Sequence, residues 1–133
     1  MKYFIASAIT NVTMVHATAE ALNAEGHVLT YDWTKNSNLA AKPEAEKMQI
    51  AADEIAAVES SDLVIVLLPG KLGSHIEIGA SIANAKGKRI LLYSADGAQF
   101  EAGDSFCIFY YHPAVERYVG SFDSFLAYLR ENF

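Results

Sequence analysis

The segment Leu63-Val64-Ile65-Val66-Leu67-Leu68, followed by Pro69-Gly70, decides the fold of this 133-residue chain. All six residues before the proline are apolar, so the strand that they form must be buried on both faces. Such a strand is typical of a parallel sheet that carries helices on its two sides. The segment therefore predicts an α/β protein.

The sequence on either side of this segment alternates between short apolar runs and longer runs with apolar residues at helical spacing. The predicted strands are residues 2–6, 28–31, 63–68, 89–93 and 106–111, and the predicted helices are residues 11–24, 44–59, 74–86 and 121–131. This alternation implies right-handed crossovers and a doubly wound five-stranded parallel sheet, most often in the flavodoxin-like or Rossmann-like order 2-1-3-4-5. We expect residues 1–133 to form one such domain.

The composition excludes several classes of partner. Sixteen Asp and Glu against ten Lys and Arg give a formal charge of −6, without a basic stripe for a nucleic-acid polymer or an anionic membrane. No apolar run reaches the roughly 18 residues of a membrane span. The single cysteine, Cys107, cannot form an intrachain disulfide and is expected to be buried. We expect a cytoplasmic protein that acts on small molecules.

The predicted sheet order places a ligand crevice outside the carboxyl ends of the first and third strands. Residues 7–11, residues 69–77 and part of the loop at 94–105 should line it. Within residues 69–79, Gly70 and Gly73 let the backbone approach a ligand, and Ser74 is a candidate N-cap. Gly79 is expected to allow close packing of the helix on the sheet.

Glu77 has two interpretations on spacing alone. Ser74-x-x-Glu77 fits a capping box, in which the carboxylate bonds back to the N-cap amide and is structural. Alternatively, a carboxylate in the first turn feels the positive end of the helix dipole, which favours the ionised form that a nucleophile needs. His75 and Lys71 are likewise open between solvated surface residues and ligand contacts.

Other familiar chemistries lack their motifs in this sequence. There is no Walker loop, no Gly-x-Gly-x-x-Gly and no Gly-x-Ser-x-Gly. The four histidines show no ligand spacing with Cys107 or with the acidic residues. We expect neither a metal nor a cofactor.

Four segments together resemble the nucleoside 2-deoxyribosyltransferase superfamily, which includes the 2'-deoxynucleoside 5'-phosphate N-hydrolases. They are KYFIAS at residues 2–7, SDLVIV at residues 61–66, GSHIEIG at residues 73–79, and Gly87-Lys88. The resemblance covers roughly residues 1–93, and its most specific part is Glu-Ile-Gly opening the helix after a buried strand.

The resemblance implies a glutamate nucleophile at Glu77. In the family this residue attacks the anomeric carbon of a nucleoside and forms a glycosyl ester, and the sugar then passes to another base or to water. The family's second acid falls on Glu54, where an aspartate is expected, with Asp53 beside it. Tyr3 matches a tyrosine that approaches the nucleophile, and Ser7 matches a serine of the hydrolases' first loop.

These roles agree with the chemistry of N-glycosidic cleavage. A carboxylate stabilises and traps the oxocarbenium character at the anomeric carbon, and a second acid delivers a proton to the departing base. Trp33, Phe4 or a tyrosine is expected to stack on the base. The residues expected to contact the substrate are Ser7, Asp53, Lys71, Gly73, Ser74 and His75.

Two other functions stay open. One is a glycohydrolase that releases nicotinamide from a dinucleotide such as NAD. The other is a non-catalytic nucleotide-sensing domain, which Glu54 and the replacement of the hydrolases' loop glycines and arginine by Ile9, Thr10 and Asn11 would favour. A homodimer or larger homo-oligomer is also expected, with residues 106–111 as either an apolar contact surface or a buried strand.

Overall fold

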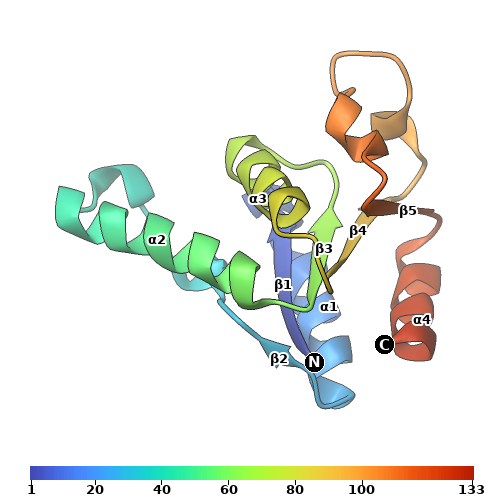
Figure 1. Ribbon diagram of the computed structural model, residues 1–133, viewed down its shortest axis with the longest axis horizontal. Helices are drawn as coiled ribbons and strands as arrows, with labels where there is room; N and C mark the ends of the chain where they lie inside the picture. The colour runs from blue at the N-terminus through green and yellow to red at the C-terminus, as the bar shows by residue number, and fades with distance from the viewer.

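The computed structural model describes residues 1–133 and contains a five-stranded parallel sheet in the order β2-β1-β3-β4-β5 (Figure 1). The strands are β1 (Lys2–Ser7), β2 (Val28–Leu29), β3 (Leu63–Leu67), β4 (Arg89–Ser94) and β5 (Val115–Val119). The helices are α1 (Val12–Ala24), α2 (Glu44–Ser60), α3 (Leu72–Ala83) and α4 (Phe122–Asn132). The predicted fold class and strand order are confirmed.

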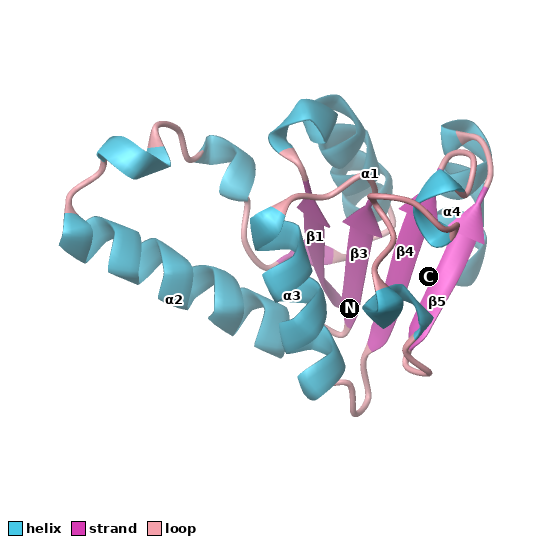
Figure 2. Ribbon diagram, turned by 90° about the horizontal axis from the view of Figure 1, so that it is seen from above, coloured by secondary structure: helices cyan, strands magenta, loops and turns pink.

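Helices cover both faces of the sheet, as the apolar run in β3 predicts. Figure 2 shows α2 and α3 on one side of the sheet and α1 and α4 on the other. All five residues of β3 are fully buried. Side chains alternate along β1, so that Phe4 packs in the cluster with α2 and α3, whereas Tyr3 packs in the cluster with α1 and α4.

The fifth strand is not where the sequence predicts it. Residues 106–111 do not pair with β4, and Ile108–Tyr111 form a 3₁₀ turn. The strand beside β4 is β5, which lies at the edge of the sheet and exposes Glu116 and Arg117. Because an edge strand needs few apolar residues, the prediction of the fifth strand at the more apolar residues 106–111 is wrong. Cys107, in that run, is half-buried rather than buried.

The amino-terminal half of α2 extends away from the sheet (Figures 1 and 2). Only Ala57 and Val58, near its carboxyl end, are buried. Its outer half faces the connection from β2, which contains the 3₁₀ turns Trp33–Lys35 and Leu39–Ala41. No helix in the structure combines the length and the apolar character needed to cross a membrane.

Candidate active site

The start of α3 differs from the prediction in a way that bears on Glu77. The N-cap is Lys71, and its backbone amide donates a hydrogen bond of 3.0 Å to Ser74 Oγ. Ser74 is therefore the third residue of the helix and not its N-cap. A Cβ on Gly70 would lie 2.9 Å from Ser74 Cβ and Oγ, so the close approach requires glycine there.

Glu77 consequently lies in the second turn of α3 and does not close a capping box. It is only 8% exposed, and its carboxylate has no hydrogen-bond partner in the protein, whereas its backbone carbonyl accepts from Ser81 Oγ at 2.7 Å. The one side-chain polar atom that is both sealed from solvent and unpaired is Nε2 of His27. The Glu77 carboxylate is thus unpartnered but still reached by solvent, although Glu77 does not line either of the cavities that Glu54 borders.

The environment of Glu77 favours its protonated form, contrary to the expectation from the helix dipole. Burial, and secondarily the negative charge of Glu54, raises the pKa of Glu77 to about 8. Burial also raises the pKa of Glu54. The dipole acts mainly within the first turn, so at the second turn the loss of hydration outweighs it. The charge interaction also shows that the two carboxylates lie close enough to influence each other.

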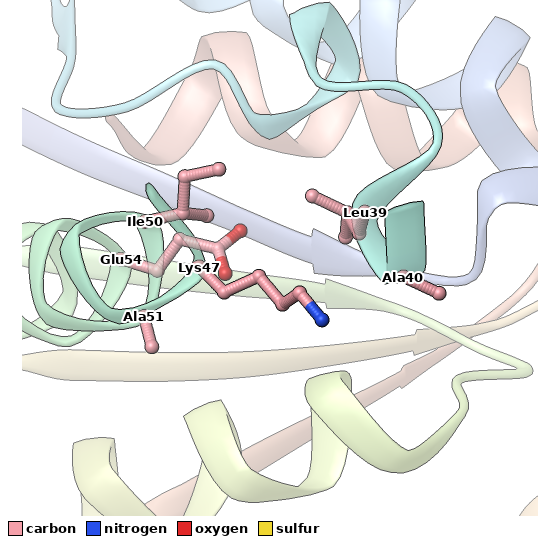
Figure 3. A pocket seen from close by; sticks show the side chains of 6 residues that line it. All are labelled: Leu39, Ala40, Lys47, Ile50, Ala51 and Glu54. Atoms are coloured by element: carbon pink, nitrogen blue, oxygen red, sulfur yellow. The ribbon is translucent and has the colours of Figure 1, made fainter. Parts of the chain in front are cut away.

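Glu54 lies on α2 and lines two adjoining cavities. The first, of about 310 Å³, is lined by Leu39, Ala40, Lys47, Ile50, Ala51 and Glu54 (Figure 3). The second, of about 520 Å³, is lined by Ile9, Trp33, Thr34, Asn36, Ser37, Asn38, Leu39 and Glu54. Asp53 lines neither cavity; it is exposed and accepts a hydrogen bond from Gln49 Nε2 at 2.8 Å. Of the two neighbouring acids, Glu54 is the one that faces a ligand-sized space.

Ser7 joins the ends of β1 and β3 at the predicted crevice. Its hydroxyl donates to the carbonyl of Leu67 at 2.7 Å and accepts from Asn11 Nδ2 at 3.0 Å. Asn11 Nδ2 also donates to the carbonyl of Pro69 at 2.9 Å. The Ser7 hydroxyl is therefore already paired within the protein, where it links the ends of β1 and β3.

Tyr3 does not approach Glu77. Its hydroxyl faces α1, where it donates to Asn23 Oδ1 at 2.8 Å and lies 3.2 Å from the carbonyl of Ala19. Because Tyr3 points to the face of the sheet opposite α3, the expected contact with the nucleophile is wrong. Phe4 points to the correct face, but it is fully buried in the core and has no surface on which a base could stack.

His75 ties α3 to the segment before β5. Its Nδ1 donates to the carbonyl of Lys71 at 2.6 Å, and its Nε2 is paired with the Tyr110 hydroxyl at 2.6 Å. The ring borders a separate cavity of about 370 Å³, into which Asp104 also faces. Lys71 and Gly73 are exposed at the start of α3, away from the cavities that Glu54 lines.

Gly79 is also exposed, and a Cβ there would meet no atom within 4 Å. It does not serve close packing on the sheet.

The structure adds residues that the sequence analysis did not identify. Lys47 lies seven residues before Glu54, which is two helical turns and hence the same face of α2. In the sequence, Lys47 could have been identified from its helical spacing to Glu54, which places both residues on the same face of α2. The larger cavity also receives amide and hydroxyl groups from Asn36, Ser37 and Asn38.

Trp33 was expected only as a stacking partner. In the structure its indole nitrogen also donates a hydrogen bond of 2.6 Å to the carbonyl of Ile5, which fixes the ring.

Comparison with known proteins identifies the family of this chain. The family profile of nucleoside 2-deoxyribosyltransferases matches residues 4–126. No sequence among curated proteins matches this chain. The chain is similar to the solved structure of the Clostridium botulinum CMP N-glycosidase BcmB, with a TM-score of 0.68, 19% identity, and coverage of 97% of this chain and 98% of that one.

A second similar structure is that of a conserved protein from Enterococcus faecalis V583. It has a TM-score of 0.61 and 18% identity, over 100% of this chain and 99% of that one. At this level of identity both structures support the fold alone. The family match extends over nearly the whole chain and includes both Glu54 and Glu77. This chain belongs to the nucleoside 2-deoxyribosyltransferase family.

Proposed function

We propose that this protein cleaves the N-glycosidic bond of a nucleoside or nucleotide, with Glu77 as the nucleophile and Glu54 as the acid. The observation that carries the proposal is the Glu77 carboxylate, which is buried, unpartnered and within the electrostatic influence of a second carboxylate. A purely structural glutamate would be expected to have a hydrogen-bond partner at this degree of burial. The family match and the similarity to a CMP N-glycosidase support the same chemistry.

The two carboxylates divide the reaction between them. The bond from the anomeric carbon to the base nitrogen breaks, and its electron pair leaves with the base. A Glu77 oxygen forms a new bond to the anomeric carbon, while Glu54 gives its proton to the base. Another base or water then displaces Glu77 from the sugar and gives up a proton to Glu54, which restores both carboxyl groups. The reactive state thus holds one proton on the pair, on Glu54. Burial and the charge of Glu54 raise the pKa of Glu77 to about 8, so in the free protein the shared proton sits on Glu77 and must pass to Glu54 before the attack.

Base release tests the proposal directly. The protein is incubated with ribonucleosides, deoxyribonucleosides, their 5'-monophosphates and NAD, each with and without an acceptor base, and free base is measured by chromatography. We expect Glu77→Gln to lower release by at least about a thousandfold, because it keeps the shape of the side chain and removes the nucleophile. Asp53→Asn is the matched control on an exposed acid. Full activity of Glu77→Gln would refute the mechanism, and release of nicotinamide alone would indicate a glycohydrolase.

We also propose that the chain forms a homodimer through the outer face of α3 and the neighbouring 3₁₀ turn. Leu72 is 87% exposed and Phe109 is 61% exposed, and Ile76 and Ile108 are exposed beside them. The same face is hollowed where Gly79 and other small or apolar residues line a cavity of about 310 Å³. Projecting side chains next to hollows suit a two-fold interface, in which one patch meets its own copy.

Sedimentation velocity tests this association. The wild-type protein should sediment as a dimer, and Ile76→Glu should sediment as a 14.5 kDa monomer. A wild-type monomer at micromolar concentration would contradict it.

A further inference from the structure

Lys47 and Glu54 extend from α2 into the same cavity. Figure 3 shows both side chains in the space between α2 and the turn that carries Leu39 and Ala40. Among the residues that line the two cavities bordered by Glu54, Lys47 is the only lysine or arginine. Any positive charge that the protein presents to a ligand beside Glu54 therefore comes from Lys47.

The charges around Lys47 leave its ammonium group unpaired. Lys42 Nζ binds Glu46 at 3.2 Å, whereas no carboxylate oxygen, including those of Glu54, lies within 4.0 Å of Lys47 Nζ. The remaining walls of the cavity are formed by apolar side chains, among them Leu39 and Ile50. Lys47 is exposed and unpaired, so its ammonium group is free to turn toward a ligand bound in this cavity.

Three other cations are engaged elsewhere. Arg89 binds Glu116 at 2.8 Å, and Arg117 donates to the carbonyl of Tyr110 at 2.8 Å. Lys88 binds three backbone carbonyls at the carboxyl end of α2. None of these groups lines the cavities beside Glu54.

We propose that Lys47 is a catalytic residue that stabilises the departing base, and that the substrates are nucleosides whose base carries a carbonyl group. The proposal rests on the function proposed above. When the glycosidic bond breaks, its electron pair passes to the ring nitrogen and is delocalised onto the carbonyl oxygen of such a base. The Lys47 ammonium donates a hydrogen bond to that oxygen while Glu54 protonates a base nitrogen. Lys47 and Glu54 do not form an ion pair with each other, so both side chains are free to contact the same ligand.

The chemistry balances without a further reactant. Glu77 supplies the electron pair of the new bond to the anomeric carbon, and the base takes the pair of the broken bond and one proton from Glu54. Lys47 keeps its proton throughout and contributes only charge and a hydrogen bond. A base without a carbonyl, such as adenine, offers Lys47 no acceptor of this kind.

The experiment compares kcat/KM for base release from deoxyuridine, deoxycytidine, deoxyinosine and deoxyadenosine. Lys47→Met removes the charge and keeps most of the chain length, Lys47→Arg keeps the charge, and Lys42→Met is the control on the neighbouring lysine. Since removal of one preorganised donor to developing charge costs on the order of a hundredfold, Lys47→Met should lose about ten- to a hundredfold on the wild type's best carbonyl substrate. Lys47→Arg should recover part of that loss, and Lys42→Met should match the wild type. Thermal melting establishes that each variant is folded.

A structural role would lower activity on all substrates alike, so the pattern across bases is decisive. The proposal is overturned if wild type cleaves deoxyadenosine as well as the carbonyl substrates, if Lys47→Met retains full activity, or if Lys42→Met loses as much. If wild type releases no base from any nucleoside or nucleotide, the proposed function fails and this inference fails with it. Base release by wild type with no effect of Lys47→Met would leave the function intact and refute the role of Lys47 alone.

Discussion

The two helices that carry the carboxylates are held in different ways. In α3, Ser74, Glu77, Ile78 and Ser81 are buried, and the first turn is anchored by Ser74 Oγ and by the pair of His75 with Tyr110. In α2 only two residues are buried, both near its carboxyl end, and its outer half contacts mainly the connection from β2. The proposed nucleophile, Glu77, thus lies on a well-packed helix, while Glu54 and Lys47 line a space whose other wall is a loop.

This difference suits the two tasks. A nucleophile must be held within a fraction of an ångström of the anomeric carbon, which calls for a packed helix. The base varies between substrates more than the reacting carbon does, and a wall formed by a loop accommodates that variation. A well-packed α3 and a loosely packed α2 should have separate, measurable consequences for activity and for stability.

The pH dependence of activity should show that the carboxylates share one proton. Since the pKa of Glu77 is about 8 and the reactive state needs one proton on the pair, kcat/KM should fall about tenfold per pH unit above pH 8. Glu54→Gln removes both the acid and the repulsion that raises the pKa of Glu77. The Glu54→Gln variant should be much less active, and its activity should instead rise with pH as Glu77 ionises with a pKa below 8. Stopped assays from pH 5 to 10 measure both profiles, and an alkaline fall that persists in Glu54→Gln would contradict the shared proton.

Stability should also depend on pH through Glu77. Its pKa in the folded protein is above the ordinary value of 4.5, so the folded state binds more protons between pH 4.5 and 8. The contribution to stability is therefore full below pH 4.5 and is lost as pH rises toward 8, by up to about 1.4 kcal/mol per pH unit. Relative to wild type, Glu77→Gln should gain on the order of a few kcal/mol between pH 5 and pH 9. Urea denaturation at pH 5 and pH 9 measures the difference in stability between Glu77→Gln and wild type. If this difference is the same at both pH values, Glu77 is already ionised in the folded protein at pH 5.

The anchoring of α3 should be sensitive to Gly70. Gly70→Ala forces a Cβ against Ser74, and we expect it to lower the free energy of unfolding by about 2 kcal/mol and to reduce base release. Gly73→Ala is the control in the same segment, because a Cβ there meets nothing within 4 Å, and it should raise stability by roughly 0.5–1 kcal/mol. Equal destabilisation by both changes would mean that the close approach to Ser74 is unimportant.

The anchoring of α2 should depend on Lys88. Its ammonium donates to the carbonyls of Val58, Glu59 and Ser61, at the end of the helix that carries Glu54. Lys88→Met should lower the free energy of unfolding by about 1.5 kcal/mol, since hydrogen bonds to a charged group are lost. Lys86→Met, on an exposed lysine two residues away, is the control. Thermal denaturation compares the two, and equal melting temperatures would contradict the anchor.

Much of the fold and part of the site could be predicted from the sequence. The apolar run at residues 63–68 predicted a sheet covered on both faces, because burial on both sides leaves a direct record in composition. Resemblance placed Glu77 and Glu54 together, and the charge interaction between them agrees with that pairing. Those expectations depended on the local hydrophobic pattern and on short sequence motifs, and each of these is formed by residues that are close together in the sequence.

The remaining features depend on contacts between segments that are distant in the sequence. The edge strand at residues 115–119 has no continuous apolar run, because at the edge of the sheet Glu116 and Arg117 are exposed to solvent between the packed residues Val115 and Tyr118. The direction of Tyr3 depends on which helix covers which face, and the protonated state of Glu77 depends on burial by segments distant in sequence. Lys47 becomes a candidate only when α2 and the turn at Leu39 enclose a cavity. A run of apolar residues records that a segment is buried, whereas the folded chain alone determines which distant groups surround an individual side chain.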